Sequence, residues 1–212
     1  MLASQTNKLG YFLNDIIEGI KAPQGFVTKV MVSLESSLYD VGDTIIKAGD
    51  SVENLVFIIS GSCDLNGFHT VPAFNSARYE RLRPGFYDRP TYKQVAETED
   101  EMEEFKIKVV TLRPGAWFGD YQIMVNVKSS WELQASKGSQ GQGVVGRISS
   151  EKVQVFELAK DRAEVIYNLY PEYRRFHFLR ASLRRTHWLK VFEENRHQWL
   201  LQKKIEEQKL VN

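Results

Sequence analysis

Apolar and polar positions change their spacing several times along this chain. Residues 8–21 carry apolar side chains at helical intervals, which predicts an amphipathic helix ending before Pro23. Residues 25–36 predict a second, short helix. Short β-branched runs follow, separated by glycines at roughly eight to twelve residues, a spacing typical of an all-β sandwich or barrel. The pattern therefore predicts a β domain preceded by helices.

The expected strands, about eight in number, are short and rich in β-branched and aromatic residues. We place seven of them around 37–40, 43–48, 54–60, 61–66, 105–112, 129–135 and 152–158. From about Lys160 the pattern is helical again, and Pro171 is expected to separate two helices because it cannot continue one without loss. The side chains expected to face the core from the last helix are Phe176, Leu179, Leu183, Trp188, Val191 and Phe192.

Residues 67–104 interrupt this rhythm with three prolines and an acidic run over 97–104. We expect an inserted loop between two strands, partly mobile. The acidic run is expected to be a solvated face, and docking of a basic partner is the alternative.

Composition narrows the function classes. A formal charge of +1 gives no general attraction to nucleic acid or to a membrane surface. Cys63 is the single cysteine, which excludes an internal disulfide and a cysteine-based zinc site. The four histidines have no metal-ligand spacing and no nucleophile motif is present, so we expect no enzyme. We expect a cytoplasmic chain, which can still be the cytosolic end of a longer membrane protein.

The segment 113–124 holds the candidate chemistry. A Pro-Gly turn is followed by an aromatic pair, then Gly119, Asp120 and a short apolar stretch that predicts one or two helical turns. Gly119 has no Cβ, so a ligand can approach its backbone closely. The helix start at Asp120 favours an anion, and the carboxylate can accept a hydrogen bond from a sugar hydroxyl. Together these features predict a pocket for a phosphate joined to a ribose.

Together with motifs on either side of this segment, the sequence resembles the cyclic nucleotide-binding domain family. The matching motifs are Gly-Asp-x-Ile-Ile-x-x-Gly at 42–49, Phe-Ile-Ile-x-Gly at 57–61 and Phe-Gly-Asp at 118–120. Segments 25–30 and 170–175 resemble the helix before the first strand of channel members and the break before their lid helix. The resemblance implies a mainly β fold: an eight-stranded antiparallel β-roll, jelly-roll-like, with N-terminal helices and a long C-terminal helix.

The resemblance also implies a domain organisation. We expect an N-terminal linker helix at 1–22, a cyclic nucleotide-binding-like domain at 23–195 with the insertion 67–104, and a C-terminal helical extension at 196–212.

The family's phosphate-binding cassette implies the candidate ligand-binding residues. They are Phe118, Gly119, Asp120, Tyr121, Lys128, Ser129, Ser130 and Arg184. The family's ribose-binding acid corresponds to Asp120, and its phosphate-binding arginine corresponds to the uncharged Ser129. Lys128 can supply a charge but no bidentate fork. Arg184 corresponds to the lid-helix residue that reaches the base in channels, and Ser129→Arg is expected to strengthen nucleotide binding.

Two functions follow from the resemblance. The first is a regulatory domain that binds cAMP or cGMP, without cofactor or metal, as the cytosolic part of a cation channel. The alternative is a degenerate domain that acts as a ligand-free scaffold through its insertion and last helix. Homo-oligomers or larger assemblies would form through the terminal helices, and a membrane would be reached only through a longer parent chain. A kinase regulatory subunit is disfavoured because no Arg-Arg-x-Ser-like segment precedes the domain.

Overall fold

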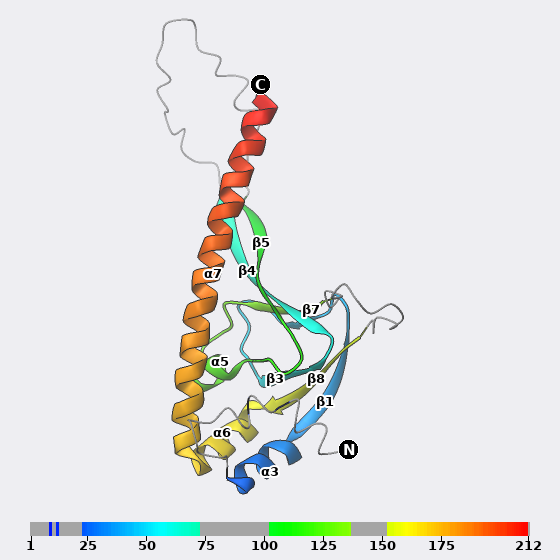
Figure 1. Cartoon of the computed structure of the whole chain (residues 1–212), viewed down its shortest axis with the longest axis vertical. Coiled ribbons are helices and arrows are strands. Elements are labelled where there is room, and N and C mark those ends of the chain that lie inside the picture. The colour runs from blue at the N-terminus through cyan, green and yellow to red at the C-terminus, as the bar shows by residue number, and fades with distance from the viewer. Residues whose placement is uncertain (1–8, 10–11, 13–22, 73–101, 137–151, 212) are drawn as a thin grey trace, which may run out of the picture. The chain divides into compact units, whose positions relative to one another are not determined.

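The computed structural model describes residues 9, 12, 23–72, 102–136 and 152–211 (Figure 1). It divides into two compact units, Met1–Gly67 with Ile107–Asn212, and Phe68–Lys106. The second unit is described only at the strand ends 68–72 and 102–106, because the centre of the predicted insertion lies outside the described residues. The predicted phosphate-binding cassette and the C-terminal helix both belong to the first unit.

Among the described residues, eight strands form two antiparallel four-stranded sheets, which confirms the predicted β-roll. The first sheet has the order β1 (Leu34–Asp40), β8 (Lys152–Ala159), β3 (Asn54–Ser60) and β6 (Trp117–Phe118). The second has the order β2 (Thr44–Ile46), β7 (Glu132–Ser136), β4 (Ser62–Pro72) and β5 (Met102–Leu112). The described helices are α3 (Gln24–Val32), α5 (Asp120–Val125), α6 (Lys160–Leu169) and α7 (Pro171–Val211).

Strand β3 is apolar on both faces because it lies between two cores. Leu55 and Phe57 pack with α3 and α6 residues such as Phe26 and Ile166. Val56 and Ile58 point the other way, into the cluster that the two sheets share. Burial on both faces explains why this strand is a continuous apolar run rather than an alternating one.

The N-terminal predictions need one correction. The helix expected over 25–36 ends at Val32, and β1 begins at Leu34, which pairs with Leu158 of β8. Pairing along β8 supplies residues 34–36 with sheet hydrogen bonds that an extended α3 would forgo. The helix predicted over 8–21 lies outside the described residues, apart from Leu9 and Phe12, which are both buried in the core.

The side of α7 that faces the roll also differs from the prediction. Leu179 and Leu183 are 61% and 72% exposed. The buried positions are Tyr173, His177, Ala181 and Trp188, with Arg184 half-buried between them. Three polar contacts along the helix fix this orientation: His177 to Tyr167, Arg184 to Asp120, and Asn195 to a backbone carbonyl.

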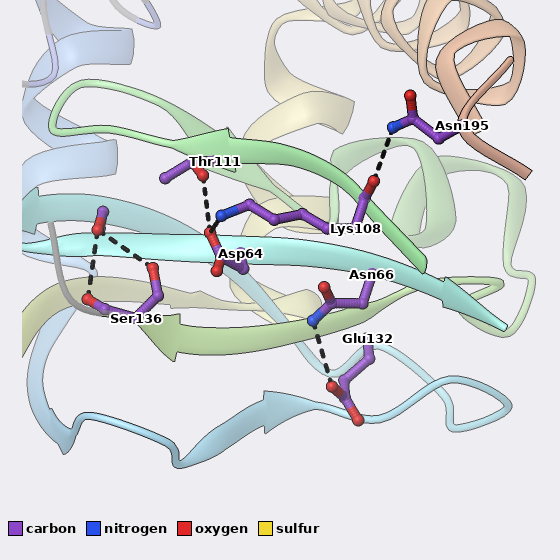
Figure 2. A network of polar contacts seen from close by, with 8 residues as sticks. Asp64, Asn66, Lys108, Thr111, Glu132, Ser136 and Asn195 are labelled. Atoms are coloured by element: carbon purple, nitrogen blue, oxygen red, sulfur yellow. Dashed lines mark hydrogen bonds and ion pairs between the residues drawn. The ribbon is translucent and has the colours of Figure 1, made fainter. Parts of the chain in front are cut away.

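Figure 2 shows the contact nearest the helix's C-terminal end. Asn195 donates to the carbonyl oxygen of Lys108 on β5 at 2.8 Å. The Lys108 ammonium lies 2.7 Å from the Asp64 carboxylate on β4, which also accepts from the Thr111 hydroxyl at 2.8 Å. These hydrogen bonds and the ion pair join α7 to β5 and β5 to β4. They fix the position of α7 along the sheet at a polar patch, where apolar packing alone would not.

Across the described residues, we find no helix both long enough and apolar enough to cross a lipid bilayer.

Stability is expected to fall as the pH is lowered from about 6.5 towards 4, because His177 is buried. Desolvation lowers its pKa to about 4, with Asp120 opposing the shift and Arg180 adding to it. The unfolded chain therefore binds a proton at a higher pH than the folded chain, so acid favours unfolding in this window. The expected loss by pH 4 is up to about 3 kcal/mol.

Urea unfolding between pH 7 and pH 4 measures this dependence. His177→Gln, which cannot titrate, is expected to flatten it. His187→Gln, at an exposed position of the same helix, is the control and should leave it unchanged. A wild-type slope in the His177 variant would assign the acid sensitivity to other groups.

Candidate functional site

The predicted cassette forms as a turn, a two-residue strand and a short helix. Gly115 donates to the Ile58 carbonyl, and Ile58 donates to that of Ala116, which fixes the turn on β3. Strand β6 follows, then Gly119 with φ of +104°, and α5 begins at Asp120. The one or two helical turns expected after Asp120 are confirmed.

Packing within the chain is by itself enough to require glycine at position 119. A Cβ at this position would lie 2.8 Å from the Asn54 carbonyl oxygen and 3.1 Å from the Val52 side chain. The chain's own β3 therefore occupies the space that the missing Cβ leaves. The positive φ adds a second reason, since residues with a Cβ are strained in this region.

Gly119→Ala is expected to destabilise the domain by about 2 kcal/mol, from backbone strain together with the close contact to Asn54. Gly42→Ala is the matched control, because Gly42 has φ of +102° and a Cβ there would meet nothing within 4 Å. The difference between their free energies of unfolding in urea isolates the contact. Equal losses would mean that β3 yields and that the packing argument is wrong.

Asp120 is buried, 4% exposed, and its carboxylate is fully engaged by the protein. The Trp117 indole N–H donates to Oδ2 at 2.9 Å, and the Tyr121 backbone N–H donates to Oδ1 at 2.9 Å. Arg184 donates to both oxygens through Nη2, at 2.5 and 2.6 Å. The acid that was expected to meet a ribose therefore binds the C-terminal helix.

Arg184 is held by aromatic rings as well as by charge. Its guanidinium lies 4.6 Å from the centre of the Trp117 ring and 5.2 Å from that of Trp188. A guanidinium on aromatic faces is stabilised by cation–π attraction. The pairing of Asp120 with Arg184 thus holds α7 over the cassette, and the Trp117 and Trp188 rings lie around the pair.

Ser129, which corresponds to the family's phosphate-binding arginine, also makes its hydrogen bonds within the protein. Ser129 is 2% exposed, and its hydroxyl donates to the Trp131 carbonyl at 2.7 Å and accepts from the Trp131 N–H at 3.2 Å. Its backbone bonds to Gly49 and Asp50. The neighbouring side chains of Lys128 and Ser130 are exposed.

Large aromatic rings fill the space between the cassette and α7. Phe118 stacks on Trp188 with ring centres 5.9 Å apart, and Trp131 meets Phe192 at 5.5 Å. Both tryptophans are buried. A Cβ at Gly67 would lie 2.5 Å from the Phe192 ring, so only glycine leaves room for that ring at this position.

Of the predicted site residues, the structure brings Phe118, Gly119, Asp120, Tyr121 and Arg184 together. It leaves Lys128 and Ser130 at the surface and Ser129 bonded to its own chain. Sequence reasoning missed Trp117 as the donor to Asp120, although a ring three residues before the acid was visible. Among the described residues, no group of three or more His, Cys, Asp or Glu side chains could hold a metal ion.

The comparison with solved structures finds regulatory domains and subunits of protein kinase A, among others. The regulatory domain of Toxoplasma gondii PKA with cAMP matches with a TM-score of 0.53 at 13% identity, over 85% of this chain and 49% of that one. A cAMP-bound PfPKA-R matches with a TM-score of 0.46 at 13% identity, over 77% and 42%. The regulatory subunit of a cAMP-independent protein kinase A from Trypanosoma cruzi, bound to guanosine, matches with a TM-score of 0.46 at 15% identity, over 78% and 41%.

The first of these likenesses shows that the chain shares the fold of the cAMP-bound regulatory domain of Toxoplasma gondii PKA. It spans about half the length of the Toxoplasma gondii structure. No family model and no curated protein sequence matches it.

Proposed function

We propose that this chain is a non-catalytic regulatory domain whose cassette is held closed by its own Arg184 rather than by a nucleotide. The observation that carries this proposal is the Asp120 carboxylate, which is buried and accepts from Arg184, Trp117 and Tyr121. The domain would act on its partners by presenting its C-terminal helix, α7, in one fixed arrangement.

The energetics favour the internal contact over a ribose. A hydrogen bond to a charged partner contributes about 1.5–3 kcal/mol, whereas a neutral one contributes about 0.5–1.5. A sugar hydroxyl replacing Arg184 would put a neutral donor on Asp120 in place of a charged one. It would also leave the guanidinium without its acid, between the Trp117 and Trp188 rings.

Calorimetric titration with cAMP and cGMP tests the proposal. We expect no saturable binding by the wild type at micromolar nucleotide, and slow amide exchange over 177–192 without ligand. Arg184→Ala, which removes the internal partner of Asp120, is titrated in the same way for comparison with the wild type. Wild-type binding with a Kd below about 10 μM, which is about 7 kcal/mol of affinity, would contradict it.

A nucleotide sensor is the second candidate, because Gly119, Asp120 and the start of α5 are retained. In that case cAMP or cGMP would displace Arg184 and open the helix. The structure changes what Ser129→Arg should do, since that side chain is 2% exposed. We expect the variant to destabilise the domain by burying a charge, rather than to strengthen binding.

The parent protein is a separate proposal. Placement in the cytosolic part of a cation channel depends on segments 25–30 and 170–175, and a kinase regulatory subunit is the other context. Membrane-spanning segments in the full-length transcript would favour the channel, and their absence would favour a stand-alone subunit.

A further inference from the structure

The face of α7 turned away from the roll carries two exposed leucines between basic residues. We call it the outer strip, and it consists of Arg175, Leu179, Leu183, Thr186 and Lys190. Leu179 and Leu183 are one helical turn apart, so their side chains are neighbours. At 61% and 72% exposure they bury little against this domain. The strip lies opposite His177, Arg184 and Trp188, so closing the cassette is what turns it outward.

Charge along this part of the helix has one sign. Residues 173–192 contain the arginines 174, 175, 180, 184 and 185 and Lys190, and no Asp or Glu. Arg184 is neutralised by Asp120. Lys190 lies 3.9 Å from Glu194, but both are well exposed, and such pairs contribute little. Of these basic residues, Arg175 and Lys190 belong to the outer strip, so its two leucines lie between two positive charges.

We infer that the outer strip binds an acidic amphipathic helix of a protein partner. Leucines on that helix would bury Leu179 and Leu183, and its carboxylates would meet Arg175 and Lys190. The inference rests on the proposed function, because a closed α7 without nucleotide is what holds the strip in place.

Two other occupants fit the strip less well. A second copy in a symmetric pair would set like charges against each other. An anionic membrane would meet only two basic residues on the strip, Arg175 and Lys190, fewer than the clusters that bind such surfaces. Two leucines also offer little apolar area for insertion.

Fluorescence anisotropy tests the inference with a labelled synthetic helix carrying leucines at helical spacing and glutamates elsewhere. The control peptide has lysines in place of the glutamates. We expect the full chain to bind the acidic peptide at least tenfold more tightly, with an affinity that falls as salt rises. Phosphatidylcholine vesicles containing phosphatidylserine form the membrane arm.

Surface variants locate the binding. Leu183→Ser is expected to weaken it about tenfold, and Arg175→Glu with Lys190→Glu to invert the peptide preference. Leu38→Ser, at a 65% exposed leucine on β1, and Lys29→Glu, at an exposed lysine on α3, are matched controls that should change nothing.

Binding of neither peptide, binding unaffected by the strip variants, tighter binding to vesicles, or self-association through the strip would each overturn the inference. None of these results bears on whether cAMP or cGMP binds, so the two proposals fail separately.

Discussion

Replacing Arg184 with alanine is expected to lower the free energy of unfolding by about 4 kcal/mol, the usual effect of removing one partner from a buried ion pair. Asp120, 4% exposed, would be left charged inside the protein with only two hydrogen bonds. The loss should exceed that from any exposed arginine on the same helix. Urea unfolding of the wild type and the variant measures it.

Arg175→Ala is the control, because Arg175 is exposed on the outer strip of α7. A double-mutant cycle with Asp120→Asn separates the pair from the surrounding packing. We expect the double variant to lose less than the sum of the two single losses. Additive losses would show that the two residues act independently and would remove the basis for a closed cassette.

Trp188→Ala is expected to cost about 4 kcal/mol, as large buried aromatic truncations do. The ring is 7% exposed, stacks on Phe118 of the cassette and supports the Arg184 guanidinium. Its loss should also free the middle of α7, so amide exchange over 184–192 should accelerate more than exchange in β3.

Trp199→Ala is the matched control on the same helix, at a partly exposed ring beyond the cassette. We expect it to cost well under half as much in the same urea experiment. Equal losses from the two tryptophans would mean that α7 is not held at the cassette in particular.

The strands were predictable because their pattern follows burial directly. A β-branched run between Gly49 and Gly61 indicated β3, the β-branched and aromatic residues over 152–158 indicated β8, and both strands lie in the core. Strand β6 was missed, since two residues carry no periodicity. The helix end at Val32 was missed because Ser33 and Leu34 suit a helix as well as a strand, and only pairing with β8 decides between them.

The orientation of α7 could not be predicted because polar residues occupy its buried side. His177 is accommodated by Tyr167, and Arg184 by Asp120, which is 64 residues away in sequence. A hydrophobic pattern places both as outward-facing and places Leu179 and Leu183 as inward-facing. Asp120 and Arg184 were each singled out, but as contacts to a ligand, since spacing along a chain does not reveal that two candidates bind each other.

The break between α6 and α7 has a mechanical consequence. Helix α7 runs for 41 residues from Pro171, a length of about 60 Å at 1.5 Å per residue. Turning it by about 10° at Tyr170 would carry its far end through roughly 10 Å, while Arg184, about 20 Å along, would travel only about 3 Å. A small displacement at the Asp120–Arg184 pair, together with loss of the Asn195 contact to Lys108, would therefore accompany a movement about three times larger at the far end of the helix.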